Sequence, residues 1–168
     1  MTTVRLEETA DVERIRRLNE QAFETPAEAG LVDLLRSRGK LVVSLVAEDG
    51  DRVVGHIAFS RVSITTTPKL RGVGLGPMAV DPGSQRQGIG SMLVRAGLDR
   101  CRDMGYDYAV VLGHPEYYPR FGFVPASQHG ITCTWEVPEG VFMALELRPQ
   151  GLAGSSGLAM YETEFNEA

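Results

Sequence analysis

Residues 72–91, GVGLGPMAVDPGSQRQGIGS, place an apolar segment directly before the start of an amphipathic helix. Residues 72–80 are apolar or glycine throughout, which is typical of a strand. The Asp-Pro-Gly sequence at 81–83 is a turn that ends the strand. Apolar side chains then recur at helical spacing from about Gly88 to Met104, and Gly105 ends the helix. The stretch therefore predicts a strand, a turn and a helix in succession.

The junction at Gln85–Ser91 has the composition of an anion-binding helix start. The first turn of a helix presents unpaired backbone N–H groups and the positive end of the helix dipole. Gly88 and Gly90 have no Cβ, so a phosphate could come close to that backbone, and Arg86 could add a charged hydrogen bond. The same glycines would also suit a tight turn that binds nothing. Neither the Walker sequence nor a complete dinucleotide fingerprint is present.

The residues before this stretch predict two helices and three strands. A short strand is expected at Val4–Leu6, and apolar side chains at helical spacing predict a helix over 11–23. A second helix is bounded by a capping-box pattern at Thr25–Glu28, with Pro26 as its first residue, and by Gly39 at its end. Residues 41–47 and 53–64 are rich in β-branched side chains, and the Asp-Gly-Asp turn between them predicts a hairpin.

The residues after the stretch predict further strands. Residues 108–112 are almost uniformly apolar, as in a strand covered on both faces. Residues 131–137 and 141–147 predict a terminal hairpin with a turn at 138–140. The sequence GLAGSSG at 151–157 predicts a flexible tail, 151–168, that ends in a loose edge strand. The fold class is α+β or α/β with a mixed central sheet, in one domain spanning 1–168.

Composition excludes several classes of function. The chain has 168 residues, of which 43% are hydrophobic, and a formal net charge of −5. An acidic chain lacks the positive field that nucleic acids and anionic membranes attract. The N-terminus is charged from its fourth residue and no apolar run reaches membrane-spanning length, so we expect a cytoplasmic protein with neither partner.

The two cysteines, Cys101 and Cys133, suggest neither a metal site nor a disulfide framework. Cys101 continues an apolar helical series formed by Ile89, Met92, Leu93 and Ala96. It is therefore expected to face the core rather than to act as a nucleophile.

Two motifs, in order along the chain, carry a family resemblance. Val80-Asp81-Pro82 followed by Gln85, Gly88 and Gly90 resembles the signature of the GNAT superfamily of N-acetyltransferases. Tyr118-Pro-Arg-Phe-Gly122-Phe123 resembles the Tyr-x-x-x-Gly-Phe motif of the same family. The resemblance covers nearly the whole chain and looks closest to the YhbS-like branch, through Gly113-His114-Pro115 and through the segment 142–147.

The resemblance implies a fold, a reaction and a set of site residues. The implied fold is a mixed, mostly antiparallel central sheet flanked by helices. The implied reaction is direct transfer of an acetyl group from acetyl-CoA, as co-substrate, to an amine. Tyr118 matches the family's candidate acid, which assists departure of the thiolate; as an alternative, it is an aromatic core residue beside Phe121 and Phe123. The coenzyme-binding residues implied are Met78, Ala79 and Val80 for the pantetheine arm and Gln85, Arg86, Gln87, Gly88, Ile89, Gly90 and Ser91 for the pyrophosphate.

Some questions stay open at this point. Many family members have an Asn where Gly113-His114-Pro115 stands here, so the coenzyme contacts on that side differ. Glu24, His114 and Glu116 are candidate bases only by their position in expected loops. The acceptor is a small-molecule or peptide amine of unknown identity, and a homodimer is left open.

Two other functions compete with the acetyltransferase. One is a metal enzyme that uses His56, His114, Glu116 and His129, although these residues lack a compact ligand spacing. The other is a non-catalytic acyl-CoA-binding or regulatory module. Such a module would bind the coenzyme without transferring the acetyl group.

Overall fold

The computed structural model describes residues 1–167, which form two compact units. Unit 1 comprises residues 1–59, 77–97 and those from 163 onward, and unit 2 comprises 60–76 and 98–162. Hydrogen bonds join the strands in the order β1-β2-β3-β4-β5-β8-β6, and β9 pairs with both β3 and β7. Strands β3 (Arg52–Ile64) and β4 (Gly72–Val80) and helix α3 (Ile89–Asp103) contribute residues to both units. Short 3-10 turns occur at Thr9–Asp11, Pro82–Ser84, Tyr118–Phe121, Ala126–His129 and Thr163–Asn166.

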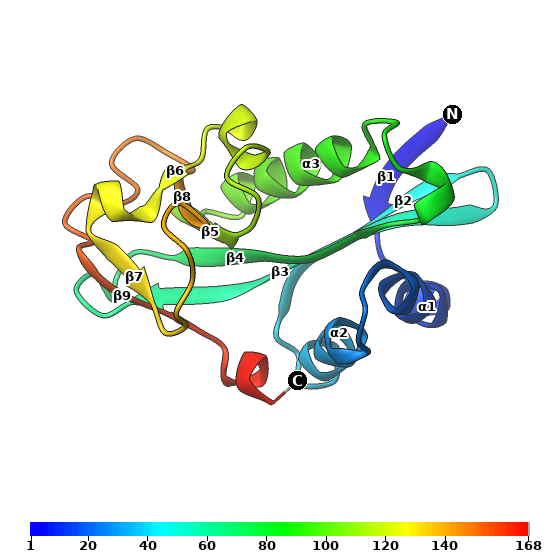
Figure 1. The fold of residues 1–168 in the computed structure, drawn as a ribbon, viewed down its shortest axis with the longest axis horizontal. Helices are drawn as coiled ribbons and strands as arrows, with labels where there is room; N and C mark the ends of the chain where they lie inside the picture. Colours follow the sequence, from blue (N-terminus) through cyan, green and yellow to red (C-terminus); the bar gives the residue numbers. More distant parts are fainter. Residues whose placement is uncertain (168) are drawn as a thin grey trace. The chain divides into compact units, whose positions relative to one another are not determined.

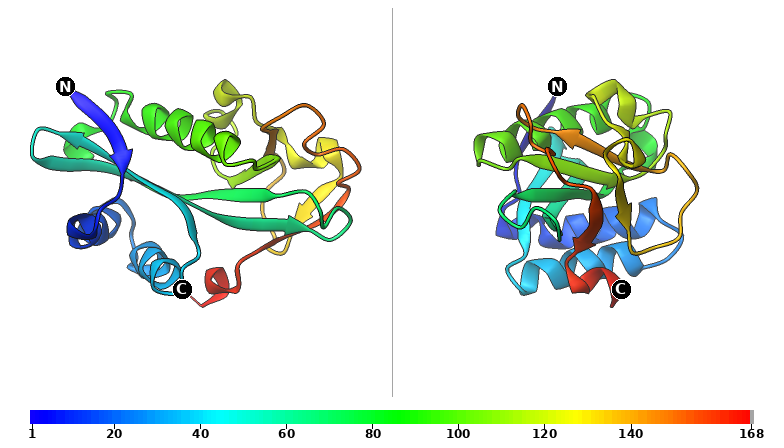
Figure 2. Two further views of the ribbon diagram at one scale, coloured as in Figure 1. Left: turned by 180° about the vertical axis from the view of Figure 1, so that it is seen from behind. Right: turned by 90° about the vertical axis from the view of Figure 1, so that its left-hand side faces the viewer.

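Unit 1 begins with an antiparallel strand pair and two helices. Strand β1 (Thr2–Leu6) pairs with β2 (Leu41–Asp49), from Thr2 opposite Asp49 to Leu6 opposite Leu45. Helices α1 (Val12–Ala22) and α2 (Ala27–Ser37) lie side by side, as Figure 2 shows. Their apolar faces meet the strands in a buried cluster of Ile15, Val32 and Val46.

Within unit 1, two glycines allow α3 to pack closely on β3. A Cβ at Gly55 of β3 would lie 2.9 Å from side-chain atoms of both Ile89 and Leu93. A Cβ at Gly97 of α3 would overlap the ring of Phe59, which is fully buried. Each element therefore has a glycine where the other presents a large side chain.

Unit 2 contains the parallel pair and the strands that follow it (Figure 1). Strand β5 (Tyr108–Leu112) runs parallel to β4 and antiparallel to β8 (Phe142–Glu146). Strand β6 (Val124–Pro125) pairs with β8, and β7 (Ile131–Cys133) runs parallel to β9 (Gly157–Tyr161). The central buried residues of this unit include Ile64, Tyr108, Val110, Ala144 and Ala159.

The expected fold class, a mixed and mostly antiparallel sheet with helices, is confirmed. The strands predicted at 72–80 and 108–112 have the predicted bounds, and the hairpin turn at Gly50 has the expected positive φ of 62°. The capping box of the second helix is not formed. Pro26 precedes the helix, and the Thr25 hydroxyl accepts a long hydrogen bond of 3.4 Å from the Ala27 N–H instead of one from Glu28.

The terminal hairpin predicted from 131–137 and 141–147 is wrong. Strand β7 ends at Cys133 and pairs with β9, whereas β8 pairs with β5 and β6. The reason is burial: Ile131 and Ala159 belong to the same core cluster, so β7 and β9 are held together across 23 intervening residues. Alternating apolar residues indicate strands but do not indicate their partners.

The predicted loose edge strand in the tail is also wrong. Strand β9 has a partner on each side, β3 and β7, and Ala159 is fully buried. The chain after β9 is anchored in unit 1, where Glu164 accepts hydrogen bonds from Arg38 at 2.9 Å and Lys40 at 3.0 Å. These two cations lower the pKa of Glu164 to about 2.

The glycine pair between α3 and β3 yields a stability prediction. Changing Gly97→Ala should lower the free energy of unfolding by about 1–3 kcal/mol, because the new methyl group overlaps the Phe59 ring. The matched control is Gly30→Ala in α2, where nothing lies within 4 Å of a Cβ; it should raise that free energy by about 0.5–1 kcal/mol through helix propensity. Urea unfolding of both variants is the measurement, and equal effects would contradict the packing.

Candidate functional site

The predicted anion-binding junction lies in unit 1 between the end of β4 and the start of α3. Its turn is tied to the neighbouring strand, since the Asp81 N–H donates to the Val54 carbonyl at 2.8 Å and Arg52 donates to the Asp81 carboxylate at 2.9 Å. The Gln85 side chain donates to the Val80 carbonyl at 3.3 Å. Hydrogen bonds thus fix the turn at Asp81 and at Gln85.

Backbone conformation at the junction requires positive φ at two positions. Gly88 has φ 79° and Arg86 has φ 67°, a conformation that costs a side chain of the L configuration free energy. Nothing lies within 4 Å of a Cβ placed at Gly88. The space in front of the backbone is therefore open at Gly88, and Arg86, Gln87 and Gly88 are all exposed.

Two of the predicted coenzyme-binding residues can contribute only their backbones. The side chain of Ile89 is buried at 3% exposure against Gly55, and that of Ala79 is buried at 2%. Helix α3 begins at Ile89, and the amide of Met92 is the one that bonds back to Gly88, at 3.0 Å. A helix start of this kind presents its first backbone N–H groups toward the space in front of it.

The pairing of β4 with β5 ends within unit 2, a few residues before this junction. Its parallel register with β5 runs from Gly72 opposite Tyr108 to Leu75 opposite Val111. The next residue, Gly76, has φ 134°, which departs from regular strand geometry. Residues Met78 and Val80, further along β4, are half-buried.

Tyr118 lies in unit 2, in a buried aromatic group. It begins the 3-10 turn Tyr118–Phe121, is 7% exposed, and meets the rings of Tyr117 and Phe123 edge-on at 5.1 and 5.8 Å. A Cβ at Gly113 would overlap its ring, so that glycine lets the tyrosine approach the end of β5. Burial raises the pKa of Tyr118 to about 12.

The sequence-predicted residues therefore fall into two groups. Residues 78–80 and 85–91 are brought together in unit 1 by a continuous strand, turn and helix, whereas Tyr118 lies in unit 2. The three candidate bases, Glu24, His114 and Glu116, are all exposed. Their geometry gives none of them a role.

The two cysteines differ in burial. Cys101 is fully buried, and burial raises the pKa of its thiol to about 12, so the prediction that it belongs to the core is confirmed. Within the same helix the predicted core position Met92 is wrong, because its side chain is 37% exposed.

No group of three or more potential metal ligands occurs among residues 1–167, and none of the helices in that range could cross a membrane.

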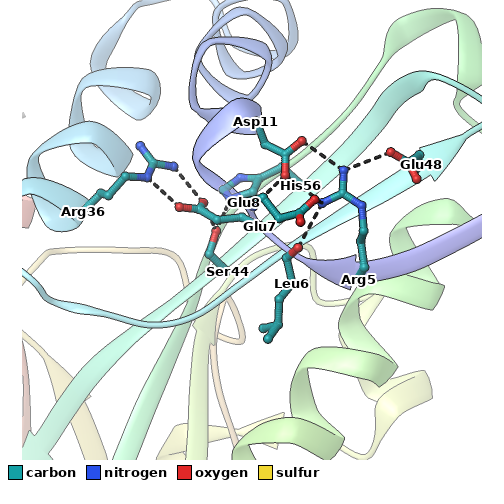
Figure 3. Close-up of polar contacts among 9 residues, drawn as sticks. All are labelled: Arg5, Leu6, Glu7, Glu8, Asp11, Arg36, Ser44, Glu48 and His56. Atoms are coloured by element: carbon teal, nitrogen blue, oxygen red, sulfur yellow. Dashed lines mark hydrogen bonds and ion pairs between the residues drawn. The ribbon is translucent and has the colours of Figure 1, made fainter.

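A partly buried polar network in unit 1 was not predicted from the sequence (Figure 3). Arg36 donates two hydrogen bonds to Glu7, at 2.7 and 2.8 Å, and the Ser44 hydroxyl donates to the same carboxylate at 2.5 Å. Ser44 then accepts from Nε2 of His56 at 2.9 Å, so we assign the proton of the imidazole to that nitrogen. Although burial alone would raise the pKa of Glu7, the hydrogen bonds from Arg36 and Ser44 lower it.

A second group of ion pairs adjoins this network in Figure 3. Arg5 donates to both oxygens of buried Asp11, at 2.7 and 3.0 Å, and to Glu48 at 2.9 Å. The hydrogen bonds from Arg5 lower the pKa of Asp11. The only sequence signal for either group is His56, which stands among the apolar residues and glycine of 53–59.

Comparison with known proteins identifies the class. A family model described as an acetyltransferase (GNAT) domain matches residues 3–126, and the chain belongs to this family. It is 40% identical over 164 residues to the N-acetyltransferase YhbS of Escherichia coli K12. The alignment covers 97% of this chain and 98% of that protein.

Two solved structures are similar over nearly the whole chain. The crystal structure of E. coli YhbS in complex with CoA has a TM-score of 0.94 at 39% identity, covering 98% of this chain and 92% of that one. A GNAT acetyltransferase from Brucella melitensis in complex with acetyl-CoA has a TM-score of 0.81 at 35% identity, covering 98% of both chains.

The buried histidine makes stability depend on pH. Burial lowers the pKa of His56 to about 4, so between pH 6.5 and 4 the unfolded chain takes up a proton that the folded chain resists. The free energy of unfolding should therefore decrease as the pH is lowered. At pH 4 the protonation of His56 in the unfolded chain should account for a decrease of about 3 kcal/mol. Urea titrations from pH 7.5 to 4 provide the measurement.

The control for this prediction is His56→Gln, which keeps an N–H donor for Ser44 but does not titrate. This variant should lose most of the slope above pH 5, whatever its stability at neutral pH. Changing His114, which is exposed, to Gln should leave the slope intact. An unchanged slope in His56→Gln would contradict the assignment.

Proposed function

We propose that this protein transfers an acetyl group directly from acetyl-CoA to an amine. The observation that carries the proposal is the open, glycine-lined start of α3, placed directly after β4 by a turn that is tied to β3. Membership of the GNAT family supports it. So do the complexes of two similar proteins, one with CoA and one with acetyl-CoA.

The residues at the junction fit a pyrophosphate. Helix-start N–H groups bind anions, Gly88 leaves the approach open, and exposed Arg86 supplies a positive charge. We assign this role to Gln85–Ser91, with Ile89 acting through its backbone alone. The backbone of Met78–Val80 is assigned to the pantetheine arm, and its N–H groups are suited to polarise a thioester carbonyl.

Direct transfer needs one bond to form and one to break. The amine, having released a proton to water, attacks the carbonyl carbon; the C–N bond forms as the C–S bond breaks. The coenzyme leaves as a thiolate, and the nitrogen gives up a second proton to form the neutral amide. The chain must bind the acceptor and stabilise the charge that develops on sulfur.

Tyr118 is our candidate for stabilising the thiolate. With its pKa near 12, a full proton transfer to a thiolate of pKa about 8.5 would cost about 5 kcal/mol. Donation of a hydrogen bond has no such cost. We therefore assign Tyr118 a hydrogen bond to the leaving sulfur and not complete protonation.

Three further properties belong to this proposal. The acceptor is a small-molecule or peptide amine, and the reaction takes place in the cytoplasm, where acetyl-CoA is produced. Residues 1–168 act as one acetyltransferase domain, which is supported by the three elements that run through both units. The homodimer stays an open question that sedimentation can answer.

The loop assignment is tested by Gly90→Asp, which adds a side chain and a negative charge at the start of α3. Calorimetry should show affinity for CoA reduced by about tenfold or more, since one charged hydrogen bond is worth roughly 1.5–3 kcal/mol. The control, Met104→Asp, adds the same charge beyond the other end of α3 and should bind normally. Unchanged affinity in Gly90→Asp, with the fold retained, would contradict the assignment of Gln85–Ser91 to the pyrophosphate.

The role of Tyr118 is tested by Tyr118→Phe, which removes only the hydroxyl group. Turnover at saturating acetyl-CoA should fall by about 10²–10⁴-fold while the affinity for acetyl-CoA changes little. Tyr117→Phe is the matched control and should have a much smaller effect. Turnover is read as free thiol released, with a thermal melt to check folding.

The same assay separates the enzyme from the competing module. A protein that binds CoA but releases no thiol with any amine is the non-catalytic module. If the Tyr118→Phe variant turns over at the wild-type rate when chemistry is limiting, Tyr118 has only a packing role in the core.

A further inference from the structure

Unit 2 contains a cavity of about 280 Å³ that none of the roles above uses. Its lining comes from the 3-10 turn at Ala126–His129, strand β7, the segment that follows β7, and the start of β8. Its volume lies just below the range typical of sites for drug-sized ligands. A compact molecule is therefore the appropriate occupant.

The lining combines apolar walls with negative charge. Ile131, Trp135 and Phe142 form apolar walls, and two carboxylates, Glu136 and Glu139, also line the cavity. Glu139 accepts a hydrogen bond from the Ser127 hydroxyl at 3.0 Å. The lining residues include no Lys, Arg or His, so their formal charge favours a cation.

The aromatic wall is held in place by the sheet. The Trp135 ring meets the Tyr161 ring edge-on, with 5.1 Å between centroids. Tyr161 in turn packs on β4, where a Cβ at Gly74 would lie 2.6 Å from its ring. This chain of contacts sets Trp135 over the sheet of unit 2 as a rigid apolar surface, and such a surface also attracts cations through its π-electrons.

Gly113 links the segment that lines the cavity to Tyr118. The Gly113 N–H donates to the Val141 carbonyl at 3.1 Å, and Val141 lies between the lining residues Gly140 and Phe142. Gly113 is also the residue on which the Tyr118 ring packs. One residue at the end of β5 therefore contacts both the tyrosine and a residue that lies between two lining residues.

We infer that this cavity binds the acceptor, and that the acceptor is a primary amine with a compact apolar body. The inference rests on the proposed acetyl transfer. The amine enters as an ammonium ion attracted by Glu136 and Glu139, and its apolar part packs against Trp135 and Phe142. It releases a proton before it attacks.

A direct binding experiment is possible because Trp135 is the only tryptophan of the chain. Its fluorescence is followed during titration with three compounds of matched shape: 2-phenylethylamine, 2-phenylethanol and phenylacetate. The amine should give a saturable change, with affinity at least about tenfold above those of the alcohol and the acid. Equal responses to all three, or none, would overturn the cavity as an amine site.

A pair of variants tests the carboxylates. The double change Glu136→Gln and Glu139→Gln keeps size and hydrogen-bonding groups while removing both charges. It should weaken amine binding by about tenfold or more and leave binding of 2-phenylethanol unchanged. Asp103→Asn, an exposed carboxylate outside the lining, is the control and should bind the amine as the wild type does.

Thiol release in the same samples separates this inference from the proposed function. If amines are acetylated with a kcat/KM that the Gln pair leaves unchanged, the cavity is not the acceptor site and the acetyltransferase stands. If Trp135 reports charge-selective binding but no amine releases thiol, the proposed function fails and the cavity remains a cation site. Acetylation that the Gln pair weakens by about tenfold supports both.

Discussion

The close packing of α3 on β3 is the constraint on which the arrangement of unit 1 depends. Gly55 of β3 receives Ile89 and Leu93, and Gly97 of α3 receives the ring of Phe59. A side chain at either glycine would push the helix away from the strand. Because β3 also anchors the turn after β4 through hydrogen bonds, the open start of the helix is held by the same strand on which the helix packs.

The polar interior of unit 1 is built on a different principle. Arg36, Glu7, Ser44 and His56 form a continuous chain of donors and acceptors, so each charge taken out of water has a partner. One neutral polar atom of this chain, Nδ1 of His56, has no hydrogen-bond partner within residues 1–167. That nitrogen would carry the proton if the imidazole became charged, which explains why the buried ring stays neutral.

Much of the fold could be predicted from the sequence, because its signals are local. The strands at 72–80 and 108–112 and the helix ending near Gly105 follow from apolar spacing and from glycine and proline at their ends. The partners of β7 and β9 could not be predicted in this way. Their pairing depends on which apolar side chains share a core, and strand alternation carries no information on that.

The same division applies to the candidate site. By itself, the sequence determined the strand, turn and glycine-rich helix start, and the position of Tyr118 in its motif, because these depend on residue type and short spacing. Only the tertiary structure decided that Ile89 packs against Gly55 of β3 and that Ala79 turns its side chain into the core. It alone brought Trp135, Glu136 and Glu139 around one cavity, because the path of the chain between β7 and β8 depends on the distant strands with which β7 and β8 pair.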